Sequence, residues 1–314
     1  MVLDLKRKEI AVLRGGWSAE RPVSLISGQA VLDALNTAGY KTRDVIVEHD
    51  APALLAALTP KPDIIFNALH GNGGEDGVIQ GFLEILGVPY THSGVAASAM
   101  AMDKAITKGV VQQHGVYCAK SVVVTATPTE ILHNPPLPYP FVIKPVSEGS
   151  SVDVFIIHNK QSYHNSSVLS NQQQQRVYLV EAYIAGRELT VPVLGNRPLT
   201  VIEITPQQGF YDYTSKYDAK QHADFTLPAP IPQEIYATAQ DFALRAHHAL
   251  GCKGVSRSDF RYNSDAPQGE QLVFLEINTQ PGMTSLSLTP TSAKHEGISF
   301  LELIETLLKD ALTK

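Results

Sequence analysis

Cysteine and tryptophan are scarce in this chain of 314 residues, which holds two cysteines and one tryptophan. Cys118 and Cys252 are too few for the disulfide framework of a small secreted domain, and neither lies in a nucleophile motif, so we interpret both as packing residues. No apolar run approaches the roughly 18–20 residues of a membrane-spanning helix, and the first residues lack the pattern of a secretory leader. These absences favour a cytosolic protein that is not integral to a membrane.

Charge is also sparse. Charged residues make up 18% of the chain, below the roughly 25% that is usual, and the net charge of −6 disfavours a large nucleic-acid surface. The P-loop motif G-x-x-x-x-G-K-[ST], the dinucleotide motif G-x-G-x-x-G and the zinc motif H-E-x-x-H are missing. Their absence excludes a P-loop match and argues against a dehydrogenase or a zinc hydrolase. Among the histidines, only His70, beside a glycine-rich loop, is a candidate site residue.

What the chain does contain is a repeated β-loop-α pattern near its start. An apolar strand at 9–13 leads into the loop 14–20 and a helical pattern, and a second strand at 63–68 leads into the glycine-rich loop 70–77 and a helix at 78–86. Such units predict a parallel sheet whose loops gather at the carboxyl ends of its strands, where open α/β sheets bind ligands. Because the chain exceeds the roughly 250–300 residues of one hydrophobic core, we expect further domains.

Two apolar strands later in the chain are predicted to form a hairpin. They cover residues 254–260 and 272–278, and the turn-like segment 263–269 joins them. A final helix is predicted to begin at Ser299, where Glu302 completes a capping box.

Four polar side chains interrupt these two strands. Residues two apart on a strand share a face, so Arg257 lies with Asp259 and Glu276 lies with Asn278. If Arg257 is opposite Glu276, all four share one face, and a slip of one residue would separate them. Two carboxylates and an amide oxygen suit Mg²⁺ or Mn²⁺ held together with substrate phosphates. From the residues alone, a solvated polar face around an Arg/Asp pair is the alternative.

Two lysines lie where a phosphate could bind. Lys144 ends the apolar strand 141–144 and precedes the small-residue loop 148–151, and Lys104 follows another apolar stretch. Solvated lysines with buried stems are the alternative. Glu20 follows a Gly-Gly loop at a predicted helix start, where a carboxylate is expected to cap the helix.

Two polar segments lie between the predicted strands. The tract 159–175 contains four consecutive glutamines and is interpreted as a solvated connection. The segment 205–227 is polar yet rich in aromatic residues, and its length predicts a lid or binding loop.

Six segments, taken in order, resemble the D-alanine-D-alanine ligases of the ATP-grasp superfamily over nearly the whole chain. They are GGWSAERPVSLISG, NALHGNGGEDGVIQGFLEILGVPYTHSGVAASAMAMDK, FVIKPVSEGSSV, VEAYIAGRELTV, GFYDYTSKY, and GCKGVSRSDF with FLEINTQPGMTSLSL. The resemblance implies an α/β and α+β chain, with a Rossmann-like N-terminal domain at 1–103 and a two-part ATP-grasp fold. Its central subdomain is expected at 104–181, and its C-terminal subdomain at 182–314 with the lid at 205–227.

The same resemblance implies roles for residues at matching positions. It assigns ATP binding to Lys104, Lys144, Ser151, Glu181, Ala182, Tyr183, Ile184, Glu188 and Lys216. It assigns two Mg²⁺ or Mn²⁺ ions to Asp259, Glu276 and Asn278. It assigns substrate binding to His70, Ser287 and Leu288, oxyanion stabilisation to Arg257 and the backbone N–H of Gly282, and a hydrogen-bonded set at the lid to Glu20, Ser150 and Tyr217.

The implied reaction joins two D-alanines with ATP, through a D-alanyl phosphate, for peptidoglycan precursor synthesis. The implied enzyme is a cytoplasmic homodimer, and Tyr217 favours D-alanine over D-lactate as acceptor. A related ligase with another acceptor, or a catalytically silent ATP-binding protein, is the alternative. Three positions depart from the family pattern: Asp153 replaces a glycine near the expected phosphate loop, Thr214 and Ser215 replace Glu-Ala in the lid, and Leu286 replaces a common histidine.

Overall fold

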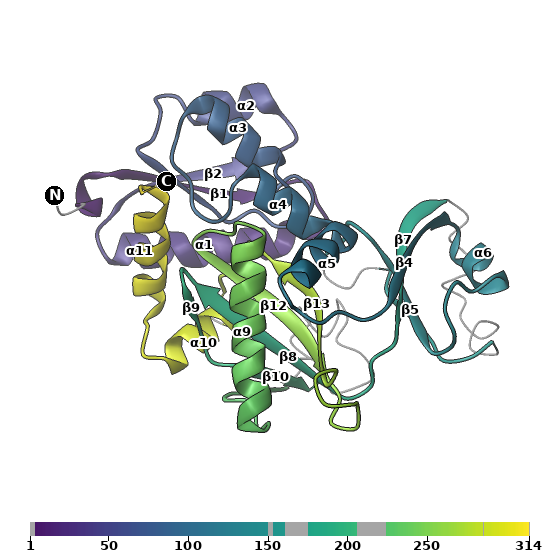
Figure 1. Cartoon of the computed structure of the whole chain (residues 1–314). Helices are drawn as coiled ribbons and strands as arrows, with labels where there is room; N and C mark the ends of the chain where they lie inside the picture. The colour runs from purple at the N-terminus through teal and green to yellow at the C-terminus, as the bar shows by residue number, and fades with distance from the viewer. Residues whose placement is uncertain (1–3, 150–152, 161–174, 206–223, 285, 314) are drawn as a thin grey trace.

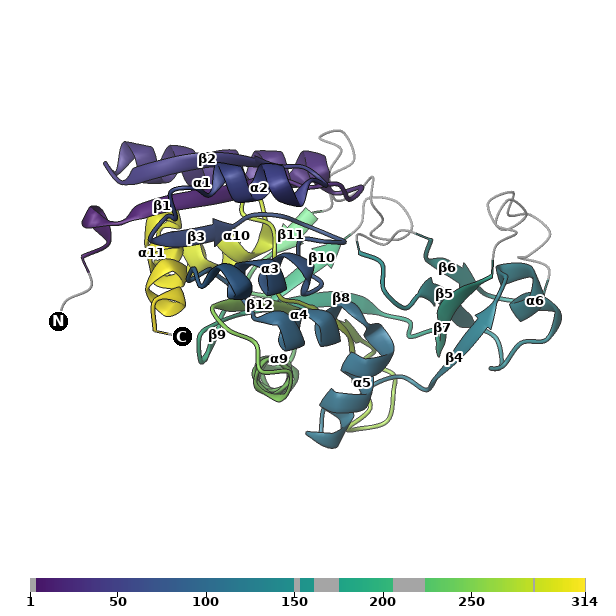
Figure 2. The same cartoon turned by 90° about the horizontal axis from the view of Figure 1, so that it is seen from above.

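The computed structural model describes residues 4–149, 153–160, 175–205, 224–284 and 286–313. Within these residues the chain forms three β-sheets, with helices packed on them (Figure 1). Seen from above, one sheet with its short helix lies at one end of the molecule, away from the N-terminal sheet (Figure 2). None of the helices in these ranges is long and apolar enough to cross a membrane.

The N-terminal sheet is parallel, as the β-loop-α pattern predicts. Its strand order is β2-β1-β3, and the central strand carries Ile10 to Leu13 at zero exposure, the continuous apolar run of a strand covered on both faces. The strands are β1 (Glu9–Gly15), β2 (Lys41–Val47) and β3 (Ile64–Asn67), and the helices are α1 (Arg21–Thr37), α2 (Ala51–Ala57) and α3 (Val78–Leu86), after the 3-10 turn η1 (Leu5–Arg7). The predicted helix at 78–86 is confirmed, and both glycine-containing loops leave the same edge of the sheet.

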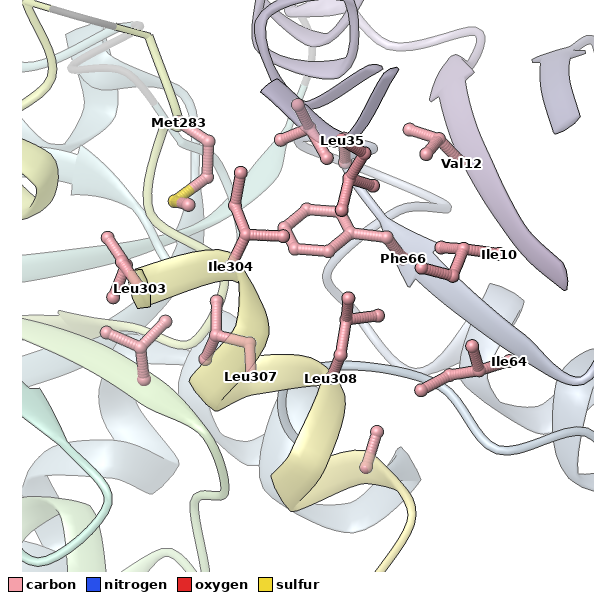
Figure 3. Close-up of a cluster of buried hydrophobic side chains, with 14 of the residues drawn as sticks. Ile10, Val12, Leu35, Ile64, Phe66, Met283, Leu303, Ile304, Leu307 and Leu308 are labelled. Carbon is pink, nitrogen blue, oxygen red and sulfur yellow. The ribbon is translucent and has the colours of Figure 1, made fainter. Parts of the chain in front are cut away.

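The last helix of the chain packs against this first sheet. Helix α11 (Phe300–Ala311) begins after Ser299 with the predicted capping box to Glu302. Its apolar face buries Ile304 and Leu308 in one cluster with Phe66 of β3 (Figure 3). The N-terminal and C-terminal parts of the chain therefore share a hydrophobic core, while the expected boundaries at residues 103 and 181 stay predictions.

The six-stranded sheet carries the predicted hairpin. Its order is β11-β10-β8-β12-β13, with β9 paired to β8, and all of its pairs are antiparallel. The strands are β8 (Arg187–Leu194), β9 (Arg197–Pro198), β10 (Ile202–Thr205), β11 (Asp224–Thr226), β12 (Val255–Tyr262) and β13 (Leu272–Asn278). The predicted lid starts at the end of β10 and includes β11, and its central residues lie outside the described ranges.

Four further helices pack around this sheet. They are α4 (Val95–Met102), α5 (Lys104–Gln113), α9 (Gln233–Ala249) and α10 (Leu288–His295). Val111 of α5 and Ala243 of α9 are buried in one cluster with Phe260 and Phe274 of the hairpin. This packing fixes the N-terminus of α5 beside β13, and this contact positions the site described below.

The third sheet has four antiparallel strands in the order β4-β7-β5-β6. They are β4 (Ser121–Ala126), β5 (Phe141–Pro145), β6 (Phe155–Ile157) and β7 (Arg176–Ala182), with α6 (Pro128–His133) on one face. Phe141, Ile143, Tyr178 and Val180 form its own small core with Ile131 of α6. Most of the polar tract predicted as a connection lies between β6 and β7, outside the described residues.

Candidate active site

The β12-β13 hairpin brings four predicted side chains onto one face. Arg257 pairs with Asn278 and Asp259 pairs with Glu276. The register in which Arg257 would lie opposite Glu276 therefore differs by two residues from the observed one, and a separate irregularity after Asp259 shifts the ladder by one residue, so that Phe260 pairs with Phe274. A two-residue displacement keeps the side-chain parity, so the predicted common face is confirmed.

The carboxylate of Asp259 is held on three sides. Its Oδ1 accepts hydrogen bonds from Arg257 Nε at 3.0 Å and from Thr190 Oγ1 at 2.5 Å, and its Oδ2 accepts from Arg257 Nη2 at 2.9 Å. Thr190 lies directly opposite Asp259 on β8. The paired contacts hold the guanidinium of Arg257 in the plane of the carboxylate, which fixes its direction.

Oxygen donors suited to a divalent cation lie on this face. Asp259 and Glu276 offer carboxylates, and Asn278 Oδ1 accepts a hydrogen bond from Gln280 N at 2.7 Å, which orients its amide. Among the described residues, no group of three or more His, Cys, Asp and Glu side chains is placed to hold a metal ion. A magnesium ion here would therefore need the amide oxygen and oxygens from a substrate phosphate, which is the usual mode for Mg²⁺.

Lys104 joins this face to the loop after β5. It is the first residue of α5, and its Nζ donates to Glu148 O at 2.6 Å and lies 3.4 Å from Glu276 Oε2. Asp103 caps the same helix, because its carboxylate accepts from the N–H groups of Ala105 and Ile106. The predicted phosphate lysine is thus anchored at a capped helix start beside the predicted metal ligands.

Lys144 and Glu181, both predicted to bind ATP, contact each other on the four-stranded sheet. Lys144 Nζ lies 2.5 Å from Glu181 Oε1, and Lys108 of α5 contacts the other carboxylate oxygen. Burial alone would raise the pKa of Glu181, but Lys144 and Lys108 outweigh it and lower the pKa to about 2. The predictions from sequence omit Lys108, although its spacing of four from Lys104 places both on one helix face.

The segment between β7 and β8, which includes the predicted ATP-binding residues Tyr183 and Ile184, is fixed to both neighbouring sheets. Arg261 of β12 donates to the carbonyls of Ile184 at 3.2 Å and Gly186 at 2.6 Å, and its Nη1 lies 3.4 Å from Glu188 Oε2. On the other side, the N–H of Tyr183 donates to the Pro140 carbonyl. Arg261 is not among the residues predicted from the sequence, because its partners lie more than 70 residues away.

Glu20 lies between two glycine loops. A Cβ on Gly71 would lie 2.7 Å from Glu20 Oε2, and one on Gly149 would lie 3.1 Å from it. The expected capping role is wrong: Glu20 is the N-cap residue of α1, but within the described residues its side chain makes no capping hydrogen bond. Its carboxylate instead points to where the N-terminal sheet meets the loop after β5.

Two further ionisable groups are buried in the glycine-rich loop after β3. His70 Nε2 lies 3.2 Å from Ser27 Oγ, and burial lowers its pKa despite the nearby charge of Glu20. Burial and then Glu20 raise the pKa of Glu75 well above its usual range. Glu75 is not among the residues predicted from the sequence, although an acidic residue inside a glycine-rich loop is a usable signal.

The segment after β13 ties the hairpin to the N-terminal sheet. Gln280 Oε1 accepts from Asn67 Nδ2 at 2.9 Å, and the Met283 N–H donates to Ser27 Oγ at 3.2 Å. A Cβ on Gly282 would lie 2.9 Å from Ser287 Oγ, so the backbone and this hydroxyl are close together. These contacts place Gly282 and Ser287 beside the N-terminal loops.

The remaining predicted residues fall into two groups. The side chain of Leu288 is buried against Ile202 and Ile204, so only its backbone can face a substrate. Ser150, Ser151, Lys216 and Tyr217 lie outside the described residues, as do Thr214 and Ser215.

Asp153 has left-handed backbone geometry, with φ of 55°. This explains why glycine is usual there, since glycine adopts that region without a steric cost. Its carboxylate pairs with Arg176 Nη1 at 3.1 Å, so its charge is matched by an arginine of β7.

Comparison with known proteins agrees with this geometry. The family model described as D-ala D-ala ligase C-terminus matches residues 119–309, and the one described as D-ala D-ala ligase N-terminus matches residues 47–93. The D-alanine-D-alanine ligase of Chelativorans sp. is 50% identical over 311 residues, which cover 98% of this chain and 99% of that protein.

Solved structures give the same result. The D-alanine-D-alanine ligase of Bacillus anthracis is 29% identical and superposes with a TM-score of 0.81 over 98% of each chain. The structure of that organism's ligase complexed with ATP is 28% identical and gives a TM-score of 0.78 over 98% of this chain and 97% of that one. The chain belongs to the D-alanine-D-alanine ligase family and has its ATP-grasp fold.

Proposed function

We propose that this chain is an ATP-dependent ligase that joins two D-alanine molecules, supplying the dipeptide for peptidoglycan precursors. The observation that carries the proposal is the polar hairpin face, with Arg257, Asp259, Glu276 and Asn278 together beside Lys104, in a chain that matches the family over its whole length. This arrangement of oxygen donors and cations is not the kind of site expected in a dehydrogenase or a zinc hydrolase.

In the first step, the carboxylate of one D-alanine attacks the γ-phosphorus of ATP. The new O–P bond forms as the bond to ADP breaks, and D-alanyl phosphate results, which is a far better electrophile than a carboxylate. Lys104 and Lys144 neutralise negative charge on the transferring group. Mg²⁺ or Mn²⁺ ions held by Asp259, Glu276 and Asn278 would supply further positive charge there when bound.

In the second step, the neutral amine of another D-alanine attacks the acyl carbon. The C–N bond forms and an oxyanion develops; it then collapses as the C–O bond breaks, and the leaving phosphate takes the proton that the amine nitrogen loses. Arg257 and the N–H of Gly282 stabilise that oxyanion. The paired hydrogen bonds to Asp259 hold the guanidinium in place beforehand, so little reorganisation accompanies the charge development.

The other predicted residues complete the proposed site. The backbone at Ala182 to Ile184 and the carboxylate of Glu188 bind the nucleoside, while Glu181, Ser151 and Lys216 contribute to ATP binding. His70, Ser287 and the backbone of Leu288 contact D-alanine. Glu20, Ser150 and Tyr217 form a hydrogen-bonded set that holds the lid closed, which keeps water from the acyl phosphate.

Phosphate release from ATP with Mg²⁺, measured with and without D-alanine, tests the proposed function when the product is identified by mass. We expect release that depends on D-alanine and the appearance of the dipeptide. If the chain is folded and binds ATP but forms no dipeptide, D-alanine is rejected as the acceptor. A competition between D-alanine and D-lactate would then identify the acceptor class.

We also infer a homodimer and a cytoplasmic location. Both are what the family resemblance implies, and ATP and the peptidoglycan dipeptide are cytoplasmic metabolites in this scheme. Light scattering at micromolar concentration tests the dimer, and fractionation of cells that produce the chain tests the location.

A further inference from the structure

Three ionisable side chains are buried together between α5 and the four-stranded sheet. Lys108, Lys144 and Glu181 are 3%, 6% and 3% exposed. Each oxygen of the Glu181 carboxylate contacts a different lysine, Oε1 Lys144 and Oε2 Lys108. The cluster therefore sets two lysines against one carboxylate away from water, and burial lowers the pKa of Lys108 while the charge of Glu181 opposes that effect.

The two lysines reach Glu181 from different parts of the fold. Lys144 is on β5, where Val142 pairs with Glu181 on β7, so Lys144 and Glu181 share a face of the four-stranded sheet. Lys108 is on α5, whose Val111 is buried in the core of the six-stranded sheet. The contact between Lys108 and Glu181 thus joins these two sheets.

If Lys144 binds the phosphates of ATP, which rests on the proposed function, then its contact with Glu181 must change. When Lys144 turns to a phosphate oxygen, Glu181 loses one of its two cationic partners. A buried carboxylate without a cation is strongly unfavourable. If Lys108 keeps its contact with Glu181, the buried carboxylate still has a cationic partner and this free-energy cost is avoided.

We propose that Lys108 is the positioning residue that keeps Glu181 ionised and oriented while Lys144 binds the phosphates of ATP. Lys108 need not touch the nucleotide, because it acts through the carboxylate. Lys108 lies on α5 one turn after Lys104, and the two lysines have different roles. Lys104 contacts Glu276 at the proposed phosphate site, whereas Lys108 contacts Glu181, the carboxylate that also contacts Lys144.

The titratable groups that face Glu181 support this assignment. They are Lys144 from β5, Lys108 from α5, and Cys118 from the segment before β4. Burial raises the pKa of the Cys118 thiol to about 11, so it is neutral near pH 7 and adds no charge. Without Lys108, Lys144 alone would oppose the effect of burial on Glu181.

A pH-dependent binding measurement tests the proposal, with MgATP as the probe and no D-alanine present. In Lys108→Met, Glu181 must take up a proton when Lys144 moves to the phosphates. Proton uptake on binding means that the affinity falls as pH rises, by up to about tenfold per pH unit. Titration calorimetry from pH 7.0 to 8.5, in buffers of different ionisation enthalpy, reports both the affinity and the proton uptake relative to wild type.

Control variants separate this role from a merely structural one. Lys108→Arg keeps the charge and should keep the wild-type pH dependence. Lys294→Met removes an exposed lysine of α10 and should bind ATP as wild type does. In a Glu181→Gln background, adding Lys108→Met should change ATP affinity by less than about twofold, because no carboxylate remains to be held.

Three results would overturn the proposal. They are unchanged ATP affinity in Lys108→Met, a loss that is equal at every pH without extra proton uptake, or a full further loss in the Glu181→Gln background. If Lys108→Met does not fold, the comparison between Glu181→Gln and the double variant decides. Failure of the wild type to make dipeptide while it binds ATP rejects only the acceptor assignment, whereas no ATP binding at all rejects both proposals.

Discussion

Lys104 Nζ lies 3.4 Å from Glu276 Oε2, and this ion pair joins the start of α5 to the strand that carries the proposed metal ligands. The same ammonium group donates to the carbonyl of Glu148 in the loop after β5. One lysine therefore contacts both walls of the proposed site. When ATP arrives, its phosphates would compete with Glu276 for Lys104, and a divalent cation would take the place of Lys104 on Glu276.

Glu276→Gln should reduce turnover by about a hundredfold or more while the fold stays intact, because the amide keeps the shape but loses the charge that would hold a cation. The side chain of Glu276 is 32% exposed, so losing its ion pair should barely change the melting temperature. Phosphate release and Mn²⁺ binding by electron paramagnetic resonance are the measurements. Glu270→Gln, on the hairpin turn, is the matched control, and full activity in Glu276→Gln would remove the metal assignment.

Arg261→Lys should raise the KM for ATP by about tenfold and change kcat much less. The planar guanidinium reaches two backbone carbonyls and Glu188 together, and an ammonium group cannot reproduce that fork. An effect on KM alone is the pattern expected when uniform binding is lost. Arg245→Lys, at an exposed pair with Asp241, is the control. An unchanged KM for ATP would show that the contacts of Arg261 do not support the nucleotide segment.

Local patterns predict the parallel N-terminal sheet and the hairpin face well, because both depend on short-range periodicity, whereas the ATP-grasp fold was predicted from the family resemblance alone. The period of two places Arg257 and Asp259 together whatever the exact register, so the face survives an error of two residues. The contacts of Lys108 and Arg261 could not be found this way, since their partners are 73 and 77 residues distant, and the spacing of Lys108 from Lys104 indicates only a shared helix face. A helix start predicts that Glu20 caps the helix, whereas tertiary packing directs its carboxylate to the glycine loops. Its predicted place in the hydrogen-bonded set at the lid stays a prediction.

Gly73→Ala should destabilise the chain by about 1–2 kcal/mol. Gly73 has φ of 84°, and a Cβ there would lie 2.0 Å from Cζ2 of Trp17, whose ring stacks on His49. Gly81→Ala is the matched control: Gly81 is inside α3 with open space around its Cβ position, so alanine should stabilise by about 0.5–1 kcal/mol. Denaturant unfolding measures both, and equal effects of the same sign would contradict the steric argument.

Glu75→Gln should stabilise the chain increasingly as pH rises from about 5 to 7. Burial and the charge of Glu20 raise the pKa of the folded-state carboxyl well above its ordinary value of 4.5. Below pH 4.5 the side chain is protonated in both the folded and the unfolded chain, so glutamine and glutamic acid should give nearly the same stability. Above it the unfolded chain ionises first, and the wild type loses up to about 1.4 kcal/mol of stability per pH unit relative to the variant until the folded pKa is reached.

The measurement for Glu75 is the free energy of unfolding in denaturant at pH 5, 6 and 7 for wild type and variant. Glu234→Gln, an exposed carboxylate in the first turn of α9, should follow the wild-type curve across the same range. A difference between Glu75→Gln and wild type that stays constant with pH would mean that Glu75 is ionised in the folded chain. Its carboxylate would then be held by a cation, and Arg257, whose charge already acts to lower its pKa, is the candidate.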